Sequence, residues 1–231
     1  MITVQPIHYT SQPHGWHRLA AVLGFVAASP LEPGWSELDA GGVLAIHQID
    51  AGDPRDGTTD LHLLVDDLGA AGSAARSAGA RVEDTPLEGV GDMLTCSFGP
   101  VVLTVSQGAR AALGDPSVLP IWYVPDTTVP ASLFRALGLV PRVASDSEVW
   151  ADFTAVGGGL VALHQGEPHT ELAFEYAGDL DGLASRLDAA GFDSVIVDEA
   201  YNRTIRVTAP GVPELLINGV QQDLYGYHGG E

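Results

Sequence analysis

Lysine is absent from this sequence. All ten basic residues are arginines, and thirty acidic residues outnumber them, which gives a formal net charge of −20. An acidic surface repels phosphate backbones and anionic lipids, so we expect neither nucleic acid nor membrane partners. The charge either attracts a cationic ligand or reflects GC-rich coding and salt tolerance, and composition alone leaves both interpretations open.

Cysteine is nearly absent too, and long apolar runs are missing. The single cysteine, Cys96, excludes a disulfide framework. No apolar run is long enough to span a bilayer, and no charged and apolar leader segment opens the chain. With 45% apolar and 17% charged residues, the sequence can nevertheless fill a substantial core. We therefore expect a soluble, cytoplasmic, globular protein.

The sequence contains two nearly identical octapeptides. GGVLAIHQ occupies residues 41–48, and GGLVALHQ occupies residues 158–165. Other segments repeat at a similar offset: HRLAAVLGF (17–25) corresponds to ASLFRALGL (131–139), with glycines 114 residues apart. A near-constant offset of half the chain indicates a tandem duplication. We expect domains at 1–110 and 118–231, joined by a loop rich in turn-forming residues.

Each half divides again into two similar units. A short strand comes first, then an amphipathic segment that stops at a glycine, the usual signal for a helix end. Alternating segments such as WSELDA (35–40), MLTCSF (93–98) and PVVLTV (100–105) follow and predict strands. The expected fold is α+β, with four βαβββ modules.

Four such modules, with helices ending in Leu-Gly and strands such as ELAFEYAGDLD (171–181), resemble the vicinal oxygen chelate superfamily. That superfamily includes glyoxalase I, extradiol dioxygenases, and bleomycin- and fosfomycin-resistance proteins. The resemblance covers the whole chain as two tandem glyoxalase-like domains. It implies that curled mixed sheets pair into cups, with the helices outside. It does not specify a reaction, because one fold hosts many chemistries.

Strand alternation indicates which side chains face the cups, because neighbouring side chains point to opposite faces. In the first octapeptide, Leu44 and Ile46 share a face suited to packing on helices, so His47 faces the cup. In the second, His164 shares its face with Leu160 and Ala162. Each histidine is a candidate ligand, or a half-buried residue kept in both copies by common descent.

The resemblance also implies a metal site in the C-terminal half. The family places ligands on the first and last strands of each module, positions that His164, Glu171 and Glu214 match here. One imidazole and two carboxylates suit a divalent ion such as Mn, Fe, Ni or Zn. Glu175 faces the same hollow and is a candidate general base, the role that a carboxylate plays in glyoxalase-type proton transfer. Its alternative is a solvated residue at the rim.

Other positions depart from the family pattern. The opening strand of the third module offers Leu119 where a ligand is expected. In the first half, Asp60 matches a ligand position, and His62 lies on the same face. Val4 and Val102 stand at the remaining positions, and aliphatic side chains cannot hold a cation. We therefore expect the better-preserved site in the C-terminal domain and a degenerate one in the N-terminal domain.

Aromatic residues add candidates for a substrate-binding wall. Trp35 and Trp150 occupy matched places in the two halves, and Trp122 and Tyr123 lie near the missing ligand position. Flat apolar side chains suit a small-molecule pocket, although core packing explains them equally well. The full set of candidates for substrate binding is Trp35, His47, Asp60, His62, Trp122, Tyr123 and Trp150.

Three functions remain open from the sequence. The favoured one is a bleomycin-resistance-like protein that binds a small molecule in an aromatic and acidic cup, without a full metal site. The alternative is a metal-dependent lyase, isomerase or dioxygenase acting on vicinal oxygens. The third is a partner-binding module with vestigial cups. Because two domains are fused, internal pairing would suffice for a monomer, although a homodimer is also compatible.

Overall fold

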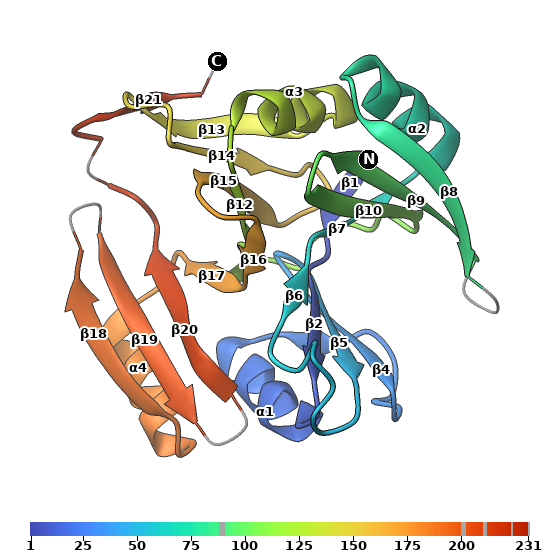
Figure 1. The fold of residues 1–231 in the computed structure, drawn as a ribbon. Helices are drawn as coiled ribbons and strands as arrows, with labels where there is room; N and C mark the ends of the chain where they lie inside the picture. The colour runs from blue at the N-terminus through green and yellow to red at the C-terminus, as the bar shows by residue number, and fades with distance from the viewer. Residues whose placement is uncertain (88–90, 200–201, 210–211, 223, 231) are drawn as a thin grey trace.

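Four copies of one βαβββ unit build the chain in the computed structural model (Figure 1). The structure describes all residues except 88–90, 200–201, 210–211, 223 and 231. In each module the first and last strands pair in parallel, and the other neighbouring strands are antiparallel. This arrangement confirms the α+β class and the modular repeat expected from the sequence.

Modules 1 and 2 occupy the N-terminal half. Module 1 comprises β2 (Ile7–Thr10), α1 (Pro13–Leu23), β3 (Val26–Ala27), β4 (Trp35–Ala40) and β5 (Gly42–Gln48). Module 2 comprises β7 (His62–Val65), α2 (Leu68–Ser77), β8 (Arg81–Leu87), β9 (Gly91–Phe98) and β10 (Val101–Gln107).

Modules 3 and 4 repeat the pattern in the C-terminal half. Module 3 comprises β12 (Ile121–Val124), α3 (Thr128–Leu137), β13 (Val140–Ser145), β14 (Trp150–Thr154) and β15 (Leu160–Gln165). Module 4 comprises β17 (Ala173–Tyr176), α4 (Leu180–Ala189), β18 (Asp193–Asp198), β19 (Arg203–Ala209) and β20 (Val212–Gly219). Helices α1 and α3 end at Gly24 and Gly138, whose left-handed conformations, φ 112° and 96°, favour glycine.

Five short strands extend the four sheets. They are β1 (Ile2–Val4), β6 (Thr59–Asp60), β11 (Ser117–Val118), β16 (His169–Glu171) and β21 (Tyr227–Gly229). The sheet orders are β3-β4-β5-β2-β6, β1-β7-β10-β9-β8, β16-β12-β15-β14-β13-β21 and β11-β17-β20-β19-β18. No helix within the described ranges is long and apolar enough to cross a membrane.

The segments that begin each module depart from the sequence interpretation. The opening segment ITVQPIHY (2–9) forms two strands of different sheets rather than the single short strand expected at the start of a module: β1 pairs with β7 of module 2, while β2 belongs to module 1. Pro6 separates the two strands, and proline cannot donate to a strand ladder. Pro120 separates β11 from β12 in the same way. The segments at 59–65 and 170–176 also divide, at Leu61 and Leu172, and their two parts join different sheets.

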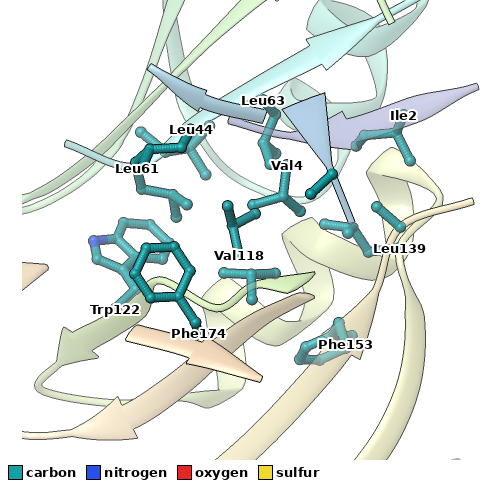
Figure 2. Close-up of a cluster of buried hydrophobic side chains, with 14 of the residues drawn as sticks. Ile2, Val4, Leu44, Leu61, Leu63, Val118, Trp122, Leu139, Phe153 and Phe174 are labelled. Atoms are coloured by element: carbon teal, nitrogen blue, oxygen red, sulfur yellow. The ribbon is translucent and has the colours of Figure 1, made fainter. Parts of the chain in front are cut away.

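The two halves share one buried core. Ile2, Leu44 and Leu63 from the first half meet Val118 and Phe174 from the second (Figure 2). Helix α1 contacts α4, and α2 contacts α3, so each helix pair also joins the halves (Figure 1). Burial of this continuous apolar surface is the main stabilising contribution to the pairing of the halves.

The repeated glycine pairs lie where the halves touch. Gly41 donates its N–H to Pro116 O, and Gly157 donates its N–H to Ile2 O. A Cβ at Gly41 would lie 2.3 Å from Ser117 Oγ, and one at Gly157 would lie 2.3 Å from Thr3 Oγ1. Gly41 begins the first octapeptide and Gly157 immediately precedes the second, so a glycine at the start of each hairpin lets it pack closely on the opening strand of the other half.

Candidate functional site

A large cavity lies between the sheets of modules 1 and 2. Its volume is about 1470 Å³, and its walls come from β2, β4 and β5 on one side and β7–β10 on the other. We call it the N-terminal cavity. Four of the residues expected to bind substrate line it: Trp35, His47, Asp60 and His62. The sequence had placed the better-preserved site in the other half.

Three aromatic rings form one corner of the N-terminal cavity. The ring centroids of Tyr9 and His47 are 5.2 Å apart, and those of Trp35 and His47 are 5.7 Å apart. Strand pairing sets this arrangement, because β5 lies between β4 and β2 and brings Trp35 and Tyr9 opposite His47. Trp35 remains 40% exposed, so its ring is available to a ligand.

A carboxylate adjoins this aromatic corner. The Tyr9 hydroxyl donates a hydrogen bond of 2.9 Å to Asp60 Oδ2, and the Arg55 guanidinium lies 4.4 Å from the centroid of the Tyr9 ring. Burial and the neighbouring Asp60 raise the pKa of Tyr9 to about 12, so the phenol stays protonated at neutral pH. Burial, followed by the charge of Arg55, lowers the pKa of His47.

An ion cluster lies deeper between β4 and the segment after β10. Arg110 forms ion pairs with Glu37 and, at 3.1 Å, with Asp39. Gln5 donates a hydrogen bond of 2.9 Å to Glu37 Oε1. Burial acts to raise the pKa of Glu37, but hydrogen bonding to Arg110 and its charge outweigh burial and lower it. Glu37 therefore stays ionised inside the cavity.

His62 is held in its neutral form. Its Nδ1 lies 2.7 Å from Thr104 Oγ1, and its Nε2 lies 2.8 Å from Ser106 Oγ. Burial lowers the pKa of His62 to about 4, against a smaller opposing effect of Glu37. Both ring nitrogens are occupied by hydroxyls, so His62 acts here as a fixed polar part of the cavity wall.

The C-terminal half contains the same aromatic corner. The Tyr123 hydroxyl donates a hydrogen bond of 3.0 Å to Glu171 Oε2, and His164 lies between Tyr123 and Trp150 at centroid distances of 5.0 and 5.8 Å. Burial and Glu171 raise the pKa of Tyr123 to about 12. Here His169 stacks on the Tyr123 ring, with centroids 4.2 Å apart and planes 9° apart.

The cup between modules 3 and 4 contains a buried ion cluster. Arg142 donates two hydrogen bonds to Glu175, of 2.7 and 2.8 Å, and one of 2.7 Å to Asp152 Oδ2. Asp152 and Glu175 are both buried. Because both Glu175 oxygens already accept from Arg142, the pairing argues against a general-base role, which stays a prediction.

The base of this C-terminal cup is apolar. A small core cluster, separate from the main core, fills it with Leu119, Ile121, Leu160, Ala162 and Ala173. Strand pairing places Ile121, the first residue of β12, beside Ala162, and Ala173, the first residue of β17, beside Leu216. These side chains offer no donor atom to a cation.

Comparisons with known proteins agree with this architecture. The chain matches a Mn(II)-bound glyoxalase from Novosphingobium aromaticivorans at 17% identity and a TM-score of 0.62, covering 95% of this chain and 81% of that one. It matches the 2,3-dioxygenase LapB from Pseudomonas sp. KL28 at 15% identity and a TM-score of 0.63, covering 96% and 92%. No protein-family model and no curated protein sequence matches.

The chain has the vicinal oxygen chelate fold. A homoprotocatechuate 2,3-dioxygenase from Arthrobacter globiformis also matches, at 13% identity and a TM-score of 0.61, over 95% of this chain and 79% of that one. At these identities the comparisons establish the vicinal oxygen chelate fold alone. Any chemical activity has to be inferred from the residues of this chain.

The metal site that the vicinal oxygen chelate resemblance implied is not assembled. Among the described residues, no group of three or more His, Cys, Asp or Glu side chains could hold a metal ion. His164 Nδ1 donates to its neighbour's carbonyl, Gln165 O, at 2.9 Å, and Glu171 accepts from Tyr123 and His169. Glu214 is exposed near the start of β20. These donors, with the apolar cup base, do not fit a divalent ion.

The register explains why the three side chains do not meet. The sequence interpretation put Glu171 on the first strand of module 4, but it lies on β16, which pairs with β12 of module 3. The true first strand, β17, presents Ala173 and Glu175 to the cup. The chain crosses between sheets at Leu172, so strand alternation counted across residues 170–176 merges two strands of different sheets.

Trp122 also lies apart from the aromatic corner. Its ring packs on Phe134, at a centroid distance of 5.8 Å, within the core that joins the halves (Figure 2). Trp122 follows Ile121 on β12, and side chains alternate along a strand, so Tyr123 faces the cup while Trp122 faces the core.

Sequence reasoning missed several residues of the two cups. Tyr9 could have been found, because it precedes Tyr123 by the same 114 residues that separate the helix glycines. Arg110 and Arg142 carried no signal, because neither has a counterpart at the repeat offset. Their roles depend on which carboxylates the folded sheets bring beside them.

Proposed function

We propose that the protein binds a small planar or cationic organic molecule in the N-terminal cavity, without a full metal site. The observation that supports this most directly is a cavity of about 1470 Å³ in which an aromatic corner adjoins a carboxylate. Ligand pockets commonly measure roughly 300–1,000 Å³ and combine apolar walls with a few oriented polar groups. The cavity can therefore enclose a molecule of this class.

The charge of the walls favours a cation. In the described part of the chain, four carboxylates line the cavity against two arginines, Arg76 and Arg110, and Arg110 is neutralised by its own carboxylate partners. The carboxylates are those of Glu37, Asp60, Asp84 and Asp92. A planar cation would stack on Trp35 and lie near Asp60, combining aromatic and electrostatic attraction. The net charge of −20 would add long-range attraction for the same ligands.

The alternative is a divalent-metal-dependent lyase, isomerase or dioxygenase. It is favoured by structural neighbours that include a Mn(II)-bound glyoxalase and several 2,3-dioxygenases. The donor atoms of this chain favour it less. In the N-terminal cavity, His62 is occupied by two hydroxyls and Glu37 by Arg110, and the base of the C-terminal cup is apolar.

We further propose that one chain is a complete binding unit, with no nucleic acid or membrane partner. The support is the continuous core between the halves, which supplies internally the pairing that two separate domains would need from dimerisation. Sedimentation equilibrium at several concentrations would test this, since a monomer keeps one mass throughout and a dimer dissociates on dilution.

The binding proposal is tested with N-methylacridinium, using acridine-9-carboxylate as an anion with the same ring system. Titration calorimetry is carried out after dialysis against a chelator. We expect saturable binding of the cation only, weakened about tenfold or more by Trp35→Ala or Asp60→Asn. Trp150→Ala and Glu171→Gln, the matched changes in the other half, should leave the affinity unchanged.

Two outcomes would contradict binding without a metal, and a third would contradict selection of a cation. One is the absence of binding after chelation together with its return on adding Mn²⁺, Fe²⁺, Ni²⁺ or Zn²⁺. The other is stoichiometric metal in protein purified without chelator, lost in Glu214→Ala, which would support the enzyme alternative. Equal binding of the cation and the anion would show that the carboxylates do not select the ligand.

A further inference from the structure

A second pocket lies between the two halves and shares Ile121, Ala173 and Leu216 with the base of the C-terminal cup. Its volume is about 860 Å³. Residues 57–60 and 100–102 of the first half form one side, and residues 121–122, 168–173 and 213–216 of the second half form the other. We call it the inter-half pocket. Strands β6 and β16 lie side by side at its wall (Figure 1).

Two buried nitrogen atoms in this pocket have no hydrogen-bond partner within the described chain. They are His8 Nε2 and Trp16 Nε1. His8 is 2% exposed and Trp16 is 1% exposed, and both residues line the inter-half pocket. Nearly all buried polar groups in proteins are paired, because an unpaired one loses its hydrogen bonds to water. Two such atoms at one pocket indicate that something else pairs with them.

The chemistry of these atoms restricts the missing partner. An indole N–H only donates, so Trp16 requires an acceptor. Thr59 occupies the other nitrogen of His8, with its Oγ1 at 2.9 Å from Nδ1, and burial lowers the pKa of His8 to about 4. A neutral His8 can therefore donate or accept at Nε2. A hydroxyl or carbonyl oxygen satisfies both residues.

The other lining residues determine which ligand framework and which ligand charge the pocket favours. Trp122, Ile121 and Leu215 provide apolar walls. Asp60, Glu171 and Glu214 are its acidic lining residues, and Arg206 lies 3.5 Å from Glu199, which reduces its attraction for anions. This lining favours a cation and opposes an anion.

We propose that the inter-half pocket is a second ligand site, which takes a small aromatic amine bearing a hydroxyl or carbonyl oxygen. The oxygen accepts from Trp16 Nε1 and pairs with His8 Nε2, the ring lies against the apolar wall, and the ammonium group lies near the carboxylates. This site shares Asp60 with the N-terminal cavity, but its lining includes neither Trp35 nor His47.

The test uses tyramine, whose phenol and ammonium groups match these requirements. Two analogues serve as comparisons: phenethylamine lacks the oxygen, and 4-hydroxyphenylacetate reverses the charge. Binding is followed through the indole N–H cross-peaks of the four tryptophans, assigned with single Trp→Phe variants. We expect tyramine at millimolar concentration to shift the Trp16 cross-peak in a saturable way, phenethylamine to bind more weakly, and the anion not to bind.

Variants separate a binding role from a structural one. Trp16→Phe keeps an aromatic ring and removes the donor, and binding to this variant is followed through the cross-peak of Trp122, which also lines the pocket. Tyramine should bind about fivefold to tenfold more weakly while phenethylamine is unaffected. Glu214→Gln alters an exposed rim residue, with little risk to folding, and should weaken both amines. Glu32→Gln, an equal charge change outside the pocket, should weaken neither. Trp35→Phe should leave tyramine binding at Trp16 unchanged.

Three results would overturn the proposal. The Trp16 cross-peak could stay in place throughout the tyramine titration. It could instead show a persistent contact with water that tyramine does not displace, which would identify a buried water as the partner. Equal tyramine affinity in wild type and Trp16→Phe would also exclude the assigned oxygen contact. Acridinium binding at Trp35 is measured separately, so the failure of one site is distinguishable from the failure of the other.

Discussion

The Tyr9 hydroxyl donates a 2.9 Å hydrogen bond to Asp60, and Tyr123 repeats this relationship with Glu171 at 3.0 Å. In both halves the phenol joins β2 or β12 to the short edge strand beside it. The pair therefore fixes a carboxylate next to an aromatic corner. The same geometry occurs twice, although aspartate stands in one copy and glutamate in the other.

Removing the Tyr9 hydroxyl should alter stability at alkaline pH. The pKa of Tyr9 is raised to about 12 in the folded protein, so the stabilisation from its neutral phenol is complete below about pH 10 and is lost as pH rises through 12. Tyr9→Phe lacks this titrating group. Between these pH values we therefore expect its free energy of unfolding to fall by about 1 kcal/mol less than that of wild type, after allowance for solvent screening. Urea unfolding between about pH 9 and 12 measures it. A Tyr9→Phe profile that falls as steeply as that of wild type in this range would contradict the assignment.

Protonation of His62 should destabilise the fold in mild acid. Its pKa is lowered to about 4, so the stabilisation from the neutral ring is present above pH 6.5 and lost as pH falls toward 4. The loss is up to about 3 kcal/mol. His62→Gln should flatten the dependence of unfolding free energy on pH in this window, whereas the exposed His14→Gln should not. Parallel pH profiles of wild type and His62→Gln would refute the assignment.

Replacing Arg142 should strongly destabilise the C-terminal half. Arg142→Met leaves Asp152 and Glu175 buried without their cation, an effect that typically costs about 3–5 kcal/mol. Adding Asp152→Asn and Glu175→Gln should recover part of the loss, because neutral amides are less costly to bury than unpaired carboxylates. Arg203→Met breaks an exposed pair with Asp181 and should cost under about 1 kcal/mol. Chemical denaturation compares all of these variants.

Gly41, which begins the first octapeptide, and Gly157, which immediately precedes the second, should be sensitive to a single methyl group. Gly41→Ala would place Cβ 2.3 Å from Ser117 Oγ and 2.8 Å from Ser117 Cα, and overpacking of this kind typically costs about 1–3 kcal/mol. Gly157→Ala should have a similar effect through Thr3. Gly229→Ala meets nothing within 4 Å and is the control. If Gly41→Ala and Gly229→Ala had equal melting temperatures, the halves would not need this close approach.

Much of the fold was readable from the sequence because its signals are local. The glycine stops of α1 and α3, the alternation in β5 and β15, and the repeated octapeptide all depend on residues near one another in the chain. Alternation also separated Leu160 and Ala162 from Val161 and Leu163, which indeed lie in different core clusters. The cup-facing direction of His47 followed from the same rule, and His47 lines the N-terminal cavity.

The candidate site was less readable, because it depends on how sheets pair. The chain crosses between sheets at Leu172, so Glu171 lies on a strand that pairs with module 3 and not on module 4, to which the sequence assigned it. Pro6, Leu61 and Pro120 mark the corresponding breaks elsewhere in the chain. Val4 and Val102 suggested a degenerate first half, yet the cavity of about 1470 Å³ lies there. A cavity depends on what the opposing sheet contributes, and that information is not local.

The sequence by itself determined the repeating βαβββ unit, the doubling of the chain and the strand faces, because periodicity and turn chemistry act between near neighbours. Only the tertiary structure decided which carboxylates pair with Arg110 and Arg142, and that the cavity of about 1470 Å³ lies in the N-terminal half. Arg110 and Arg142 each meet carboxylates that lie on a different strand or segment, and a charge far along the chain cannot be matched to its partner until the sheets have packed.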